Sequence, residues 1–302
     1  MNLTKVKGNT FFLEGRQHIP LYQLDEHHCI LMDPGRADER TGIEEALQEA
    51  QLVPVGVMIS HMHYDHHENT RYFKEKYKCQ SALARQDAEL CRDLVSLRNH
   101  LYTFTPGLLE KTPRLQNLIC DTDYCILPSE TSIEFMGATF GILHTPGHSP
   151  SHICITTPDD VCFVGDCLMT DSELATAKVP FVFDLAQDIK SKEKLMQTHH
   201  AAYLFSHQGI ETPPLDRLTK ANMQLIDTVL ALFLRVVSKP MMLSDIYGSV
   251  SRQLGLASGH PMRAFYLERY LRPYLDYLID EGKLVYADGN GAPTLAPAED
   301  PA

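Results

Sequence analysis

Side chains of the types that bind metal ions recur in this sequence directly after short apolar segments with the composition of buried strands. They share this placement in four separate parts of the chain: His61, His63, Asp65, His66, His148, Asp166 and His207. Loops at strand ends can bring such residues together from distant positions, because the sheet beneath them is rigid. We therefore expect a fold in which several strands end around one metal site.

The first four of these residues lie within six positions of one another. Alternate residues of extended backbone point the same way, so His61 and His63 can share one metal ion. Asp65 and His66 then face a second centre a few ångströms away. A single carboxylate can bridge two metal ions, and Asp166 suits that role because it follows another apolar run. The sequence thus predicts a two-metal site.

The rest of the chain alternates strand-like and helical segments, as in a mixed α/β protein. Short apolar or β-branched runs bounded by turn residues indicate strands. They lie at 6–12, 19–24, 29–32, 53–60, 132–135, 139–143, 153–156, 161–164 and 203–205. Helical composition marks 38–51, 68–79 and 185–197. Residues 84–118 are interpreted as helical insertions over the sheet face that can supply a substrate wall.

A boundary is expected at Thr212-Pro213-Pro214, which would divide the chain into a catalytic domain, residues 1–212, and a C-terminal domain, residues 213–302. Three helical segments follow, at 215–237, 243–254 and 263–279. Pro273 should kink or split the last of them. A hairpin with a tight glycine turn is expected at 283–295. Three helices and a hairpin are the order of a winged-helix module.

The composition of the chain bears on its location and partners. With 302 residues, 44% hydrophobic and 22% charged, it has the composition of a soluble globular protein. No apolar run reaches the roughly 20 residues that span a bilayer, and the start lacks the apolar block of a secretory signal, so we expect a cytoplasmic protein with no membrane partner. A formal charge of −12 disfavours nucleic acid as a partner. The apolar C-terminal part favours a packing role and is compatible with a homodimer.

In this order the residues resemble the metallo-β-lactamase superfamily. The HxHxDH signature of that family stands here as His61-Met62-His63-Tyr64-Asp65-His66, and its Thr-Pro-Gly-His loop as Thr145-Pro146-Gly147-His148. Gly165-Asp166 and His207 match its other ligand positions, over residues 5–210. The resemblance implies a four-layer αββα sandwich, followed by a small helical, winged-helix-like domain. That layout is typical of the glyoxalase II-like and β-lactamase-like protein 2-like branch.

The resemblance also implies a role for each site residue. His61, His63 and His148 would hold one metal ion, Asp65, His66 and His207 the second, and Asp166 would bridge them. Spacing alone leaves His144 and His148 open, and the resemblance selects His148. His67 and His152 stay open in the same way. Asp33, His144 and His152 are expected to support the site without binding metal, and Asp65 to orient the nucleophile or carry its proton as well.

The family's chemistry implies a metal-dependent hydrolase in which a hydroxide bridging two divalent metal ions attacks a carbonyl or phosphorus centre. We expect Zn²⁺, and iron or manganese is also compatible with histidine and carboxylate ligands. The acidic chain and the full ligand set favour a small-molecule thioester, lactone or ester as the substrate. Two alternatives stay open, namely a ribonuclease or phosphodiesterase, and a non-haem iron oxidoreductase of the persulfide dioxygenase type.

Overall fold

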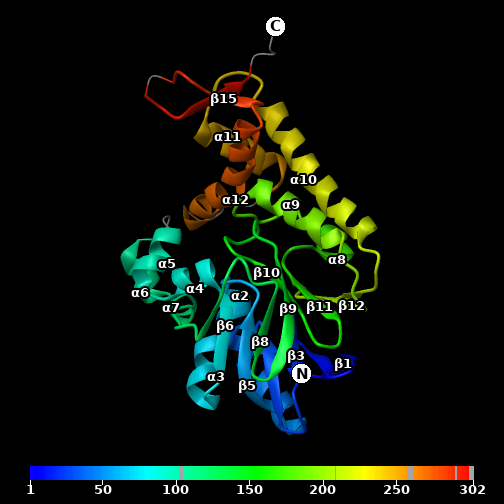
Figure 1. The fold of residues 1–302 in the computed structure, drawn as a ribbon. Coiled ribbons are helices and arrows are strands. Elements are labelled where there is room, and N and C mark those ends of the chain that lie inside the picture. The colour runs from blue at the N-terminus through cyan, green and yellow to red at the C-terminus, as the bar shows by residue number, and fades with distance from the viewer. Residues whose placement is uncertain (102–104, 208, 257–260, 290, 299–302) are drawn as a thin grey trace.

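Two large β-sheets pack face to face in the computed structural model, and helices cover the outer face of each sheet (Figure 1). The structure describes residues 1–101, 105–207, 209–256, 261–289 and 291–298. The layers are helix, sheet, sheet and helix, which confirms the predicted four-layer αββα sandwich. The last helices stand at one end of the sandwich, at the top of Figure 1. Among the described helices, none is both long enough and apolar enough to cross a bilayer.

The first sheet has seven strands that lie side by side in the order of the sequence. They are β1 (Leu3–Lys7), β2 (Thr10–Glu14), β3 (His18–Gln23), β4 (His28–Met32), β5 (Val53–Ile59), β6 (Gln80–Ala84) and β7 (Tyr124–Ile126). The first four pair antiparallel, and β4 to β7 run parallel. Parallel strands end at the same edge of a sheet, so the loops after β4, β5 and β6 leave from one side.

The second sheet has six strands, in the order β13-β12-β11-β10-β9-β8. They are β8 (Ser132–Phe135), β9 (Ala138–His144), β10 (Ile153–Thr156), β11 (Val161–Gly165), β12 (Ala202–Phe205) and β13 (Ile210–Glu211). β11 pairs parallel with β12, and β10 pairs antiparallel with both β9 and β11. β9, β11 and β12 therefore share one direction, and their carboxyl ends meet at one edge.

Alternation along the strands builds the core. In β11, Val161 and Phe163 point into the apolar layer between the two sheets, while Cys162 and Val164 point to the helices outside. Met58 of β5 meets the same inner layer from the first sheet. Successive side chains of a strand point to opposite faces, so β11 buries apolar side chains on both of its faces.

Helices cover both outer faces. α1 (Arg40–Glu49), preceded by the 3₁₀ turn η1 (Ala37–Glu39), and α3 (Thr70–Tyr77) bury Leu47 and Phe73 against the first sheet. α9 (Leu185–Met196) and the start of α10 (Asp216–Val236) bury Leu195 and Leu218 against the second. The shorter helices are α2 (Tyr64–His67), α4 (Arg85–Cys91), α5 (Leu94–His100), α6 (Pro106–Lys111), α7 (Pro113–Asn117) and α8 (Asp171–Leu174).

The C-terminal part has the expected order of three helices and a hairpin. It comprises α10, β14 (Met241–Met242), α11 (Leu243–Gln253), α12 (Pro261–Asp280), β15 (Leu284–Ala287) and β16 (Thr294–Pro297). Its core holds Phe233 and Tyr274, whose rings stack with centroids 6.0 Å apart. Val182 and Leu185, from earlier in the chain, join the same core. The domain boundary at 212 and the winged-helix assignment stay predictions.

Three expectations from the sequence are wrong in detail. Residues 6–12 do not form one strand, because a turn at Gly8, with φ of +54°, separates β1 from β2. β6 and β7 were not expected, since β6 opens on polar Gln80 and takes its conformation from pairing with β5. Pro273 lies inside α12, which continues past it, so the expected split is wrong and the expected kink stays a prediction; buried neighbours such as Leu275 hold the helix in the core. Position 290 of the expected glycine turn lies outside the described residues.

The packing between the sheets generates a stability prediction. Phe163 is 1% exposed and lies in the inner layer. Phe163→Ala should lower the free energy of unfolding by about 3–5 kcal/mol, because the lost apolar burial leaves a cavity. Chemical denaturation measures the change. Val95→Ala, at a position 68% exposed, should change it by less than about 0.5 kcal/mol and is the control. Equal effects of the two substitutions would contradict the assigned core.

Candidate metal centre

Loops from the carboxyl ends of β5, β9, β11 and β12 bring seven histidine and aspartate side chains together at one end of the sandwich. They form two groups in which the ligand-type atoms lie within 4.8 Å of one another: His61, His63, His148 and Asp166 in one, and Asp65, His66 and His207 in the other. These are the seven residues that the sequence singles out. We call the two groups the first pole and the second pole.

Three imidazole nitrogens converge at the first pole. His63 Nδ1 lies 2.9 Å from His61 Nε2 and 2.9 Å from His148 Nε2. Burial lowers the pKa of His61 and His63 well below the ordinary histidine value, and lowers that of His148 to about 3. The three rings are therefore neutral, which is the form that ligates metal ions.

A chain of hydrogen bonds from Asp33 sets the orientation of His61. The backbone N–H and the hydroxyl of Ser60 donate to Asp33, at 2.6 Å and 2.5 Å. Because the only hydroxyl hydrogen of Ser60 is used in this way, Ser60 Oγ must accept from His61 Nδ1–H, 2.9 Å away. The Nε2 lone pair of His61 is left to face the pole.

Backbone contacts orient His148 in the same way. Its Nδ1–H donates to the carbonyl oxygen of Phe181 at 3.0 Å, so its Nε2 carries the lone pair. Gly147, beside it, has φ of +135°, and a Cβ there would collide with the backbone of Asp188 in α9. Ser191 of α9 also donates to the carbonyl oxygen of Pro146 at 2.7 Å. The loop before His148 is thus held against α9.

The second pole takes its orientation from Asp33 as well. His66 Nδ1–H donates to Asp33 at 2.7 Å, which leaves His66 Nε2 facing Asp166 Oδ2 at 3.4 Å and Asp65 Oδ2 at 3.9 Å. His207 Nε2 lies 4.0 Å from Asp65 Oδ2 and 3.5 Å from Asp166 Oδ1. The two carboxylates therefore lie between two histidines.

Asp166 lies between the poles. Its Oδ2 is 3.3 Å from His148 Nε2 and 3.4 Å from His66 Nε2, while its Oδ1 faces His207. The backbone N–H of Asp166 donates to His152 Nε2 at 3.0 Å. The preceding Gly165 has φ of +57°, and a Cβ there would lie 2.5 Å from His152. His152 thus holds the backbone that carries the central carboxylate.

The electrostatic environment of these seven side chains favours a bound cation. Burial would lower the pKa of His66, but the carboxylates of Asp166 and Asp65 outweigh it and raise that pKa well above its ordinary value. Burial would likewise raise the pKa of Asp166, but His66 and the other histidines hold it well below its usual range. His66 Nε2 and Asp166 Oδ1 are buried and form no hydrogen bond with any described residue. Imidazole lone pairs and carboxylate oxygens without hydrogen-bond donors are what divalent ions bind, so the residues fit a metal site.

The residues expected to support the site have different surroundings. Asp33 and His152 contact the cluster as described above. His144 does not, because it ends β9 and its ring Nε2 lies 2.9 Å from the carbonyl oxygen of Glu130. His67 is buried with its Nδ1 2.8 Å from the hydroxyl of Thr70. The structure therefore puts neither His144 nor His67 among the ligand-type atoms.

The sequence analysis missed Asp87, which joins the two main loops of the site. It is fully buried in α4 and accepts hydrogen bonds from Met62 N–H at 2.9 Å and from the hydroxyls of Ser149 and Ser151 at 2.9 Å. Burial raises the pKa of Asp87 even though these donors oppose the shift. Its helix carries no motif, so only the loops that it binds could have identified it.

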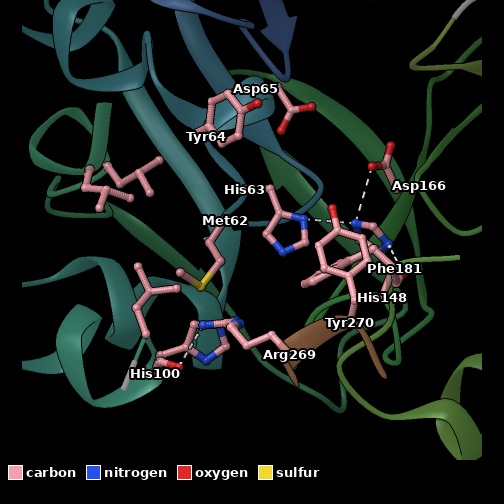
Figure 2. Close-up of a pocket in the computed structure, with 13 residues that line it drawn as sticks. Met62, His63, Tyr64, Asp65, His100, His148, Asp166, Phe181, Arg269 and Tyr270 are labelled. Carbon is pink, nitrogen blue, oxygen red and sulfur yellow. Dashed lines mark hydrogen bonds and ion pairs between the residues drawn. The ribbon is translucent and has the colours of Figure 1, made fainter. Parts of the chain in front are cut away.

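A cavity of about 320 Å³ opens over the first pole (Figure 2). His63, Asp65, His148 and Asp166 contribute polar atoms, and apolar side chains form most of the remaining wall. The apolar part consists of Met62, Leu101, Leu115, Leu118, Phe181 and Tyr270. Tyr270 and Arg269 come from α12, so the C-terminal part contributes directly to the cavity.

Comparison with known proteins identifies relatives of this arrangement. A family model described as the metallo-beta-lactamase superfamily matches residues 14–207. Among solved structures, a metallo-beta-lactamase family protein from Thermus thermophilus superposes with a TM-score of 0.72 at 18% identity, over 96% of this chain and 98% of that chain. A beta-lactamase domain protein from Burkholderia ambifaria superposes with a TM-score of 0.70 at 18% identity, over 98% and 93%. These two similarities show the fold.

Three curated relatives are longer proteins that match part of this chain. An atrochrysone carboxyl ACP thioesterase of Passalora fulva is 22% identical over 83% of this chain and 66% of its own length. A beta-lactamase-like protein 2 homolog of Drosophila melanogaster is 24% identical over 63% of this chain and 58% of its own. A hydroxyacylglutathione hydrolase of Photobacterium profundum is 25% identical over 51% and 47%. The chain thus spans less than two thirds of the length of each.

The role of Asp33 can be tested by metal affinity. Asp33→Asn keeps the volume but replaces one acceptor oxygen by an NH₂ group, so Ser60 and His66 lose part of their orientation. Metal affinity, measured by competition with a chelator, should fall about 10–100-fold. His144→Gln should leave it unchanged, because that ring contacts Glu130 instead. Circular dichroism checks that both variants fold. Loss of affinity in the His144 variant alone would contradict this account.

Proposed function

The chain belongs to the metallo-β-lactamase superfamily, and from that premise we propose that it is a metal-dependent hydrolase of small-molecule acyl thioesters or esters. One observation carries the proposal. Seven histidine and aspartate side chains converge beneath a cavity whose walls are mostly apolar. Such a cavity suits an acyl group better than a polymer backbone, and its polar atoms gather where the bond would be broken.

We propose that the first pole holds one metal ion and the second pole another, with Asp166 between them. Zn²⁺ is the ion that we expect, because the proposed first pole offers three neutral imidazoles. Bound there, the cations would acidify water and polarise a carbonyl group. The chain's own residues do the rest. Asp33 and the carbonyl oxygen of Phe181 aim the imidazole lone pairs, and His152 steadies the backbone of Asp166.

Asp65 is the residue that we propose for proton transfer. Its side chain is 22% exposed, in contrast to the buried His66 beside it, and it lines the cavity. Gln17 donates to its backbone carbonyl oxygen, which fixes the start of α2. A carboxylate in this position can orient an attacking water, accept its proton and pass that proton to the leaving group.

The choice of thioesters rests on the relatives as well as on the cavity. One curated relative is named a thioesterase, and another is named for the hydrolysis of hydroxyacylglutathione, which is itself a thioester. We extend this chemistry to the present chain because the cavity presents a sulfur, three leucines and two aromatic rings beside the first pole. We also propose that residues 213–302 form a separate winged-helix-like unit whose function here is to complete the cavity, since α12 supplies Arg269 and Tyr270.

Removal of the central carboxylate tests the proposed function. Asp166→Ala should abolish metal binding and turnover, because the proposed ligand shared by both poles is lost. Elemental analysis counts bound metal, and a panel of thioesters, lactones, phosphodiesters and RNA measures turnover before and after treatment with a chelator. Asp227→Ala, on the exposed side of α10, should change neither. Full activity in metal-free Asp166→Ala, or cleavage of RNA but of no thioester or ester, would contradict the proposed function.

A further inference from the structure

We propose that the substrate has two unlike parts, an apolar acyl group and an anionic group on the other side of the scissile bond, and that Arg36 and Arg114 bind the anionic part at Tyr64. This inference rests on the proposed function and narrows its substrate class. It starts from the contrast between a chain of net charge −12 and two arginines that both lie over the ring of Tyr64, a residue of the cavity wall.

Tyr64 is the centre of this edge. It lines the cavity, is 36% exposed, and lies in the chain between His63 of the first pole and Asp65 of the second. The guanidinium carbon of Arg36 lies 5.4 Å from its ring centroid, and that of Arg114 also lies 5.4 Å away. The two cations are therefore no more than twice that distance apart.

The acidic neighbours leave this positive charge incompletely balanced. Arg36 pairs with Asp38 at 3.3 Å, but Asp38 also pairs with Arg16 at 2.8 Å, so one carboxylate serves two guanidinium groups. Asp65, the other carboxylate near Arg36, is a proposed metal ligand. Arg114 is exposed on α7 and forms no ion pair with a described residue. A carboxylate or phosphate held at Tyr64 would supply negative charge near both guanidinium groups, and the planar guanidinium fork matches such anions.

The opposite side of the cavity suits the acyl group. The ring centroid of Phe181 lies 5.2 Å from that of His63 and 4.8 Å from that of Tyr270 of α12. Figure 2 shows Tyr64 and Asp65 on one side of His63, and Phe181 and Tyr270 on the other. If the scissile carbonyl of the substrate lies at the two poles, its acyl chain would extend toward Phe181 and Tyr270. The anionic part of the substrate would then extend toward Tyr64.

Two thioesters that share one apolar acyl group separate these contributions. The coenzyme A thioester carries phosphates on the thiol part, and the N-acetylcysteamine thioester is neutral there. With metal-loaded full-length protein, we expect a lower KM for the coenzyme A thioester. Arg36→Ala and Arg114→Ala should each raise that KM about tenfold, as loss of one charge-assisted contact does, and the neutral thioester should change much less. Added salt should weaken only the anionic substrate.

Controls make the outcome decisive. Arg114→Lys should restore part of the preference because it keeps the charge, and Arg235→Ala, exposed at the end of α10, should leave both KM values unchanged. Calorimetry with a non-hydrolysable coenzyme A thioether should show the same loss of affinity without turnover. Equal KM values for the two thioesters in the wild type would overturn this inference and leave the hydrolase standing. A wild type that cleaves neither these two thioesters nor any other thioester or ester of the panel would overturn the proposed function and this inference together.

Discussion

The buried contact between Asp33 and Ser60 is the interaction on which the site depends. Asp33 follows β4 and Ser60 follows β5, so their hydrogen bonds join the ends of two parallel strands. The carbonyl oxygen of Ser60 accepts the N–H of Ile153 at 3.0 Å, which ties this point to the second sheet. One polar network therefore joins the two sheets and sets the rings of His61 and His66. Buried polar groups are costly unless each has a partner, and here Asp33 is satisfied by Ser60 and His66.

Much of this fold could be predicted because its central strands are continuous apolar runs, as strands buried on both faces must be. Runs such as 153–156 and 161–164 are short, apolar and bounded by turns, and the structure has strands at both. Histidine and aspartate residues placed just after the predicted strands identified the end of the sandwich at which the candidate site lies. β6 escaped prediction because Ser81 and the alanines around it have weak intrinsic preference for a strand. Their conformation comes from pairing with β5, which is a tertiary effect.

The supporting residues were harder to predict than the ligand-type ones. His152 and His144 lie close to the same loop, and spacing could not distinguish their surroundings. The structure does, because His152 meets the backbone of Asp166 while His144 meets Glu130. No sequence pattern distinguished Asp87, because acidic residues are common in short helices on protein surfaces. Its burial follows from three partners, Met62, Ser149 and Ser151, that reach it from two distant loops.

The cavity wall explains why the cluster by itself names no substrate. Arg269 of α12 donates to the carbonyl oxygen of His100 at 3.1 Å, a contact between residues 169 positions apart. The insertion and the C-terminal part thus meet over the cavity, and neither contains a ligand-type residue of the two poles. Substitutions in either can change the shape of the wall without disturbing the network at Asp33. Much of the cavity wall thus comes from segments outside the ligand loops, so the motif by itself does not name a substrate.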